Sequence, residues 1–245
     1  MIDRVLIAIG GIGSRYGCPE IGLPSKCFIK FDNKTLIEYI FDMIIQLRSK
    51  PHISIVLTTV QQEDMCKKVL YNYNINYDVL YNIKDDAFYS IQSCENTLII
   101  YGDTFFFNRY DLKNMENIFL QYGESVYMLI PTKNGIDDVV FRIDFESKII
   151  NNVYKGQQIL EASQVYLFSK RDSKIIMDYI NSESKYNIIY KYLMPQGKSF
   201  AYFGNCVNIN TQDEYTHIRH IYKGNNIGKD FLDFDQPNDG KSLST

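Results

Sequence analysis

The feature that most constrains the fold is a short apolar run near the N-terminus that ends in a cluster of glycines. Residues 5–9 read VLIAI, and the loop GGIGSRYG follows at once over 10–17. A short, fully apolar run closed by glycines is typical of a buried parallel strand. We therefore expect the loop at the carboxyl end of that strand, where open α/β sheets bind their ligands.

The first half of the chain alternates between predicted strands and helices. Strands are indicated at 53–59 and 97–103, and helices at 35–50 and 61–72. Thr35 and Glu38 have the spacing of a capping box at the start of the first helix. This alternation predicts a Rossmann-like α/β/α sandwich with a mixed, mainly parallel central sheet. Asp103, at the end of the third strand, would then lie on the same rim as the glycine loop.

The second half has a different pattern. Short strands at 125–131, 139–144, 148–154 and 164–169, joined by turns, indicate a meander. Helices are expected at 171–182 and 185–194, one more strand at 199–210, and a helix opened by Thr211 and Glu214. The length of 245 residues suits one large domain as well as two small ones. Because no internal repeat or linker divides the sequence, we expect a single domain over 1–222 followed by a tail over 223–245.

Composition excludes several classes of function. A net charge of -3 gives no basic field for nucleic acid, and no apolar run approaches the thickness of a membrane. The five cysteines form no CxxC motif, which argues against a zinc site or a disulfide framework and favours the cytoplasm. His217 and His220 lack a third ligand, so we interpret them as surface histidines.

The glycine loop fits neither of two common phosphate-binding motifs. A dinucleotide loop needs GxGxxG, but Tyr16 stands at the third glycine position and Gly17 comes one residue late. A P-loop needs Lys followed by Ser or Thr after its last glycine, but Ser14 and Arg15 follow Gly13. One reading that remains is a loop whose N–H groups bind phosphates, helped by Arg15 and by Lys26 of LPSK. The other is a tight turn with two solvated cations.

Three motifs in order resemble a known family. The segment IAIGGIGSRYG, followed by LPSKCFIKFDNKTLIEYI, resembles the N-terminal signature of nucleotidyltransferases with a glycosyltransferase-A-like fold. LIIYGDTFF resembles their strand ending in Gly-Asp, and VNINTQDEY resembles their C-terminal (D/N)xDTPEDL element. Enzymes of this family couple a nucleoside triphosphate to a phosphorylated sugar, polyol or choline-like acceptor and release pyrophosphate. The resemblance implies a nucleotide-binding half over 1–122 and an acceptor-binding half over 123–222.

The resemblance also implies roles for individual residues. Arg15 and Lys26 would act on the triphosphate, and Lys155 on the acceptor phosphate, although Lys155 also reads as a solvated surface lysine. Mg²⁺ would be held by Asp103 with Asn208 or Asn210. Nucleotide contacts are implied for Ile9, Gly10, Gly11, Gly13, Ser14, Ser90 and Gly102. For Ser90, a simpler reading is a residue at the start of a helix.

The sequence departs from the family pattern at two places that matter. LPSK has one residue between proline and lysine, which is closer to the acidic-sugar cytidylyltransferases and favours CTP. Asn208 and Asn210 stand where the family usually has aspartates, which weakens the inference of a metal.

Two rival functions compete with this reading, one motivated by the departures and one by the shared fold class. A nucleotide-binding relative without catalytic activity would explain the loss of both carboxylates. A glycosyltransferase would present Asp-x-Asp, but the sequence reads Asp103-Thr104-Phe105. The family suggests a role in nucleotide-sugar and capsule polysaccharide biosynthesis. The acceptor stays open, and so does the oligomeric state, for which a homodimer is one option.

Overall fold

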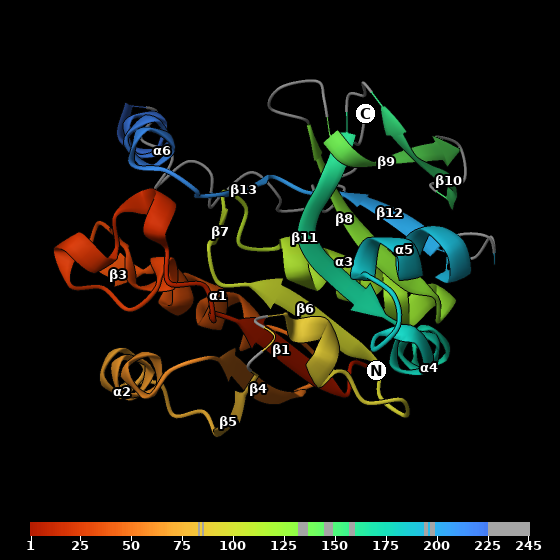
Figure 1. The fold of residues 1–245 in the computed structure, drawn as a ribbon, viewed down its shortest axis with the longest axis horizontal. Helices are drawn as coiled ribbons and strands as arrows, with labels where there is room; N and C mark the ends of the chain where they lie inside the picture. The colour runs from red at the N-terminus through yellow and green to blue at the C-terminus, as the bar shows by residue number, and fades with distance from the viewer. Residues whose placement is uncertain are drawn as a thin grey trace, which may run out of the picture.

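In the computed structural model, the apolar run near the N-terminus is the buried strand β1 (Arg4–Ala8), and it lies inside a large sheet (Figure 1). The structure describes residues 1–82, 84, 86–131, 137–144, 149–156, 160–193, 196 and 199–224. Of residues 131, 137–144, 149–156, 160–162, 190 and 221–224 it describes the backbone alone.

Within these residues, nine strands form the main sheet in the order β5-β4-β1-β6-β11-β8-β12-β10-β9. The strands of the N-terminal half, β5, β4, β1 and β6, are mutually parallel, and β12 runs parallel to β8. β11 is antiparallel to both β6 and β8, and β10 is antiparallel to β12 and β9. The prediction of a mixed, mainly parallel α/β sheet is therefore confirmed. The strand bounds are β4 (His52–Leu57), β5 (Tyr77–Tyr81), β6 (Thr97–Tyr101), β8 (Ser125–Pro131), β9 (Asp137–Asp144), β10 (Ile149–Gly156), β11 (Leu160–Phe168) and β12 (Ser199–Phe203).

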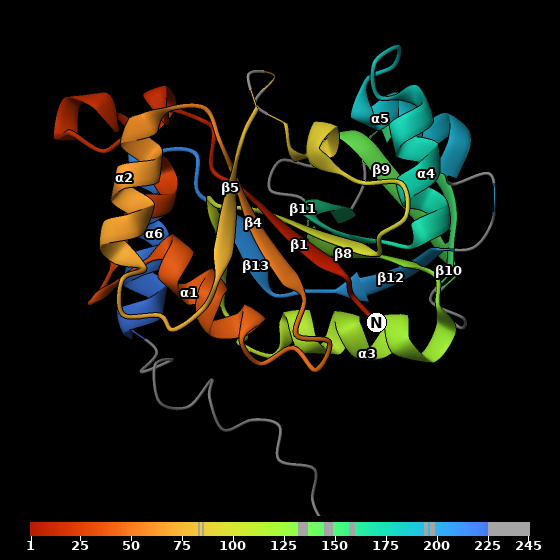
Figure 2. The same cartoon turned by 90° about the horizontal axis from the view of Figure 1, so that it is seen from below.

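Helices cover both faces of this sheet. Figure 2 shows α1 and α3 on one face and α4 and α5 on the other. A capping box of Thr35 and Glu38 starts α1, as predicted, and a second box of Thr59 and Gln62 starts α2. The helix bounds are α1 (Leu36–Ile44), α2 (Val60–Val69), α3 (Asp111–Tyr122), α4 (Lys170–Tyr179), α5 (Lys185–Ile188) and α6 (Gln212–Gly224). No helix among the described residues is both long enough and apolar enough to span a membrane.

The two faces of β1 belong to two different hydrophobic clusters. Val5 and Ile7 join the cluster that contains α1 and α3 side chains, whereas Leu6 joins the cluster with Ile176 and Ile188. All three strand residues are fully buried. A strand buried on both sides needs apolar residues at every position, which explains the uninterrupted run in the sequence.

Two short ribbons lie beside the main sheet. β2 (Lys30–Phe31) pairs with β3 (Lys34–Thr35), and β7 (Thr104–Phe106) pairs antiparallel with β13 (Cys206–Asn208). The second ribbon brings the segment after β6 next to the segment after β12. It therefore joins two of the sequence motifs that are far apart along the chain.

The second half differs from the predicted meander. β9 and β10 pair as neighbours, but β11 lies between β6 and β8, and β12 lies between β8 and β10. The strand expected over 199–210 is divided into β12 and β13 at Gly204, where an added Cβ would stand 2.5 Å from the Met128 sulfur. The N–H of Asn205 donates to the Asp111 carboxylate (3.0 Å), so the chain turns toward α3 instead of continuing along the sheet.

The C-terminal helix α6 runs to Gly224. Residues 225–245, which hold most of the predicted tail, lie outside the described residues.

Candidate active site

The glycine loop leaves β1 at the carboxyl end of the strand and turns back at Gly13. Gly13 has a φ of +67°, and a Cβ at this position would stand 2.6 Å from the Cys18 sulfur and 2.8 Å from Lys26 Cγ. Both the left-handed backbone and the close approach require glycine. The same approach fixes the stem of Lys26 against the loop.

The loop is held from behind by one buried side chain, Gln62 of α2. Its Nε2 donates to the carbonyl oxygens of Gly10 (3.0 Å) and Pro24 (3.1 Å), and the Thr58 hydroxyl also donates to Gly10 (2.9 Å). The side chain of Gln62 is fully buried. It therefore connects the glycine loop, the LPSK segment and the start of α2, a role that we did not predict from the sequence.

The N–H groups of the same loop are left available. Among the described residues, the backbone N–H groups of Gly11, Ile12 and Gly13 have no hydrogen-bond acceptor. Successive free N–H groups in a turn are the feature that lets such loops bind anions.

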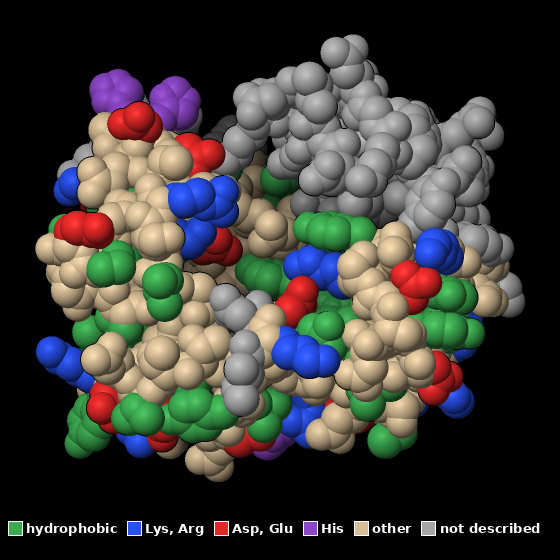
Figure 3. Space-filling view, in the orientation of Figure 1, with side chains coloured by type: hydrophobic (Ala, Val, Ile, Leu, Met, Phe, Trp, Pro, Cys, Tyr) green, Lys and Arg blue, Asp and Glu red, His purple; other side chains and the backbone are tan. Residues whose placement is uncertain are grey.

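A charged centre lies beside the loop. Lys26 Nζ donates to Asp103 Oδ2 (2.5 Å) and to Asn210 Oδ1 (3.1 Å). Arg15, which is exposed, makes a longer contact of 3.5 Å with the same Asn210 oxygen. The side chains of Lys26 and Asp103 are 13% and 18% exposed, so the pair is partly shielded from water. Figure 3 shows basic and acidic side chains next to one another at the hollowed centre of this face.

Local hydrogen bonds orient the two asparagines of the VNIN element differently. Asn208 Oδ1 accepts from the Thr104 hydroxyl (2.9 Å), across the ribbon of β7 and β13. The next residue, Ile209, donates its N–H to the carbonyl oxygen of Asp103 (2.9 Å). Beyond this bond, the Asn210 side chain lies at the charged centre, where its Oδ1 accepts from Lys26 Nζ. Its position is fixed by Glu214, whose carboxylate accepts the Asn210 N–H (2.6 Å).

A cavity of about 180 Å³ opens between the loop and the charged centre. It is lined by Ala8, Ile9, Gly10, Gly11, Ser25, Tyr101 and Asp103. Gly102 lies directly behind it, since a Cβ there would meet Ile9 Cγ2 at 2.6 Å and Cys27 Cβ at 3.0 Å. Only glycine lets β6 approach β1 this closely and carry Asp103 to the rim.

A second polar cluster adjoins this cavity at Tyr101. The Tyr101 hydroxyl donates to Asp86 Oδ1 (2.8 Å) and accepts from Lys185 Nζ (2.8 Å), which also contacts Asp86 Oδ2 at 3.2 Å. Burial, followed by the charge of Asp86, raises the pKa of Tyr101 well above its ordinary value, so its hydroxyl stays protonated. No motif in the sequence indicated this cluster.

The remaining predicted residues lie elsewhere or are described in part. Ser90 ends the helical turn Ala87–Ser90 and is not among the residues that line the cavity. Lys155 lies on β10, and its side chain is outside the described part of the chain. His217 and His220 are exposed, and two histidine side chains are visible on the surface over α6 in Figure 3. The described residues contain no cluster of three or more His, Cys, Asp or Glu side chains that could hold a metal by itself.

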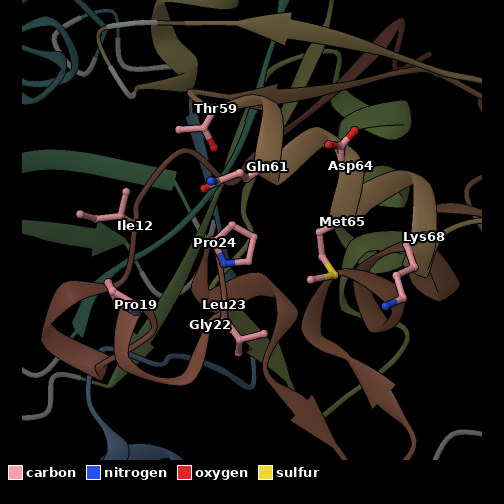
Figure 4. A pocket seen from close by; sticks show the side chains of 10 residues that line it. All are labelled: Ile12, Pro19, Gly22, Leu23, Pro24, Thr59, Gln61, Asp64, Met65 and Lys68. Atoms are coloured by element: carbon pink, nitrogen blue, oxygen red, sulfur yellow. The ribbon is translucent and has the colours of Figure 1, made fainter.

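A larger cavity, of about 640 Å³, lies between the loop segment and α2. Figure 4 shows its lining side chains, which come from the loop segment on one side and from α2 on the other. They are Ile12, Pro19, Gly22, Leu23, Pro24, Thr59, Gln61, Asp64, Met65 and Lys68. None of Lys26, Asp103 and Asn210 lines this cavity, but Ile12 belongs to the glycine loop, so the cavity adjoins the candidate active site.

Several solved structures share this architecture over almost their full length. CTP:phosphocholine cytidylyltransferase from Streptococcus pneumoniae superposes with a TM-score of 0.71 at 16% identity, covering 90% of this chain and 98% of that one. Apo UDP-glucose pyrophosphorylase gives a TM-score of 0.71 at 14% identity, covering 91% and 99%. The fold is that of the nucleotidyltransferases. The inositol-1-phosphate CTP transferase of T. maritima is similar as well, with a TM-score of 0.63, 18% identity, and coverage of 91% and 97%. No protein-family model and no curated protein matches the sequence.

The nucleotidyltransferase resemblance noted in the sequence is therefore confirmed at the level of the fold. The three motifs that carried it meet at one place, because Lys26, Asp103 and Asn210 belong one to each motif. The roles of these residues stay predictions.

Proposed function

We propose that this protein is a nucleotidyltransferase that couples a nucleoside triphosphate to a phosphorylated sugar, polyol or similar small phosphomonoester and releases pyrophosphate. The observation that carries the proposal is the contact of Lys26 with both Asp103 and Asn210 beside a glycine loop with free N–H groups. The fold shared with several nucleotidyltransferases supports it.

The reaction would be an in-line attack of an acceptor phosphate oxygen on the α-phosphorus of the triphosphate. A phosphomonoester is already largely ionised at neutral pH, so the chain does not have to supply a general base. The tasks that remain are alignment and neutralisation of charge. Arg15 and the loop N–H groups would bind the β- and γ-phosphates, and Lys26 would stabilise the charge that develops on the leaving pyrophosphate. Lys155 is the proposed partner of the acceptor phosphate.

The donor set at the charged centre fits Mg²⁺. One carboxylate oxygen of Asp103 and one amide oxygen of Asn210 converge on the same ammonium group, so a cation placed there would meet both. Mg²⁺ takes oxygen ligands and usually keeps several waters or phosphate oxygens, so two ligands from the protein suffice. When bound, the ion would offset phosphate charge and polarise the α-phosphate. Asp103 and Asn210 are the residues that would hold it, while the Asn208 oxygen already accepts from Thr104.

CTP is the first candidate for the donor. The LPSK spacing supports this choice, and two of the similar structures are named for transferring cytidylyl groups or using CTP. UDP-glucose pyrophosphorylase has the same fold, so the fold does not favour one base. We place the reaction in cytoplasmic nucleotide-sugar biosynthesis of the kind that supplies capsule polysaccharides.

A nucleotide-binding relative without catalytic activity is the second candidate. The observation in its favour is that, within the described residues, Asp103 is the one carboxylate that contacts Lys26, and amides stand at 208 and 210.

Pyrophosphate release distinguishes the two candidates. The protein is incubated with Mg²⁺ and each of CTP, UTP, GTP, ATP and dTTP, against pooled sugar, polyol and amino-alcohol phosphates. We expect release with one triphosphate, its loss in Asp103→Ala, and its retention in Asp178→Ala, which removes an exposed carboxylate on α4. Nucleotide binding without any release across the panel would favour the non-catalytic relative.

A further inference from the structure

The side chain of Lys26 occupies the position that a divalent cation would need. Its ammonium group lies 2.5 Å from Asp103 Oδ2 and 3.1 Å from Asn210 Oδ1, the two oxygens that form the proposed metal site. A protein ammonium and a metal ion cannot both fill the space between these atoms. The free protein therefore carries its own cation in the site.

The charges at the centre reinforce this competition. Asp103 supplies one negative charge, Lys26 supplies one positive charge, and Asn210 supplies none, while the exposed Arg15 adds a positive charge 3.5 Å from the Asn210 oxygen. Both ionised side chains are less than one fifth exposed, so water screens their attraction only in part. A metal ion that approaches the free protein meets a carboxylate that is already neutralised, and it must displace a partly buried ammonium.

A triphosphate would relieve the competition, because it offers the ammonium new partners. The stem of Lys26 is fixed, since its Cγ packs against Gly13 of the loop proposed to bind the phosphates. The terminal part of the side chain can then turn from Asp103 to a phosphate oxygen while the stem stays in place. The phosphates would at the same time supply the additional oxygen ligands that the metal needs.

We propose that Lys26 and the divalent cation compete for the oxygens of Asp103 and Asn210, so that the metal is admitted only when a triphosphate takes over the lysine ammonium. Loading is then ordered, and the free protein has low affinity for divalent cations. The triphosphate step rests on the function proposed above, whereas the competition in the free protein does not.

The test is a titration of Mn²⁺ into the free protein, followed by electron paramagnetic resonance of the unbound ion. We expect Lys26→Met to bind Mn²⁺ at least about tenfold more tightly than the wild type, because one competing charge is gone. Lys34→Met is the matched control, since Lys34 forms a similar 2.5 Å pair with Asp42 away from the site. Adding Asp103→Asn to Lys26→Met should abolish the gain.

Lys26→Gln provides a second variant in case Lys26→Met fails to fold, because the glutamine amide can still donate to Asp103. The wild type is then titrated with Mn²⁺ in the presence of the α,β-methylene analogue of CTP, the first candidate for the donor. Water proton relaxation separates the ternary complex from free Mn²⁺-nucleotide, and the analogue should raise the affinity for Mn²⁺.

Equal Mn²⁺ affinities in the wild type, Lys26→Met and Lys26→Gln would overturn the competition. A gain in the variants without any effect of the analogue would overturn the ordered loading. Absence of pyrophosphate release in the wild type would count against the proposed function alone, because the titration of the free protein needs no catalysis.

Discussion

Replacing Gln62 tests how the glycine loop is held in place. Its amide connects three backbone segments, donating to Gly10 and Pro24 while its Oε1 accepts the N–H groups of Thr58 (2.9 Å) and Thr59 (3.2 Å). Gln62→Met has a similar volume but makes none of these bonds. The Gly10 carbonyl keeps the Thr58 hydroxyl as a donor, whereas the Pro24 carbonyl loses the Gln62 donor.

The expected loss of folding stability follows from the number of hydrogen bonds that are removed. A buried polar group left without a partner costs about 1–3 kcal/mol. The Pro24 carbonyl and one or both threonine N–H groups are affected, and their bonds to Gln62 are only partly buried. Each then costs the lower part of this range, so we expect the free energy of unfolding to fall by about 2–5 kcal/mol. We also expect weaker nucleotide binding, because the loop N–H groups are no longer held in one arrangement.

In Gln62→Glu, we expect stability and nucleotide affinity to depend on pH. A glutamate keeps the acceptor oxygen but places a carboxylate against two carbonyl oxygens. Burial would raise its pKa above the unfolded value of about 4.3. A group with a raised folded-state pKa stabilises the fold below the unfolded pKa, and this stability is lost as the pH rises through the folded pKa. Stability and nucleotide affinity of this variant should therefore both fall with rising pH.

Urea denaturation and nucleotide titration from pH 4.5 to 8 measure these effects. Gln61 is the matched control, because it is the exposed neighbour of Gln62 on the same helix, and Gln61→Met and Gln61→Glu should change little. The reasoning is refuted if Gln62→Met unfolds within about 0.5 kcal/mol of the wild type and binds nucleotide normally.

Three further predictions concern Lys26, Gly102 and Asp111. Lys26→Ala should lower the rate of pyrophosphate release by about 10²–10³, the cost of removing one preorganised donor, and near-normal turnover would exclude the role given to Lys26. Gly102→Ala should lower the free energy of unfolding by about 1–3 kcal/mol in urea, because its Cβ would meet Ile9 and Cys27. Burial raises the pKa of Asp111 above 3.8, so the stability of the wild type relative to Asp111→Asn should fall as the pH rises above that value. Parallel urea denaturation curves that keep a constant difference across pH would contradict this.

Local patterns made several features of the fold predictable. The strand β1 and the start of α1 follow from an apolar run and a capping box, both of which act over a few residues. The meeting of Lys26, Asp103 and Asn210 was predictable for a different reason. Each lies in a recognisable motif, and two of the motifs follow strands whose carboxyl ends share one rim.

Long-range packing made other features unpredictable. Gln61 and Gln62 are adjacent glutamines in one polar helix, yet one is exposed and the other is fully buried. The spacing of Thr59 and Gln62 was a usable signal, since it is the pattern of a capping box. The insertion of β11 between β6 and β8 had no such signal, because strand order is decided by contacts between distant segments.

The replacement of two aspartates by Asn208 and Asn210 has a different meaning in the structure than in the sequence. In the sequence, amides in place of carboxylates count against a metal. In the structure, the amides have separate tasks, since Asn208 binds Thr104 while Asn210 contacts Lys26. An aspartate at 210 would place a second carboxylate against Lys26 in a partly shielded site. With an amide there, Lys26 pairs with Asp103 alone, and the exposed Arg15 adds a positive charge that favours a triphosphate over a metal ion. Asparagine at 210 therefore supports the proposed order of binding, in which the centre binds a metal ion only after a triphosphate has bound.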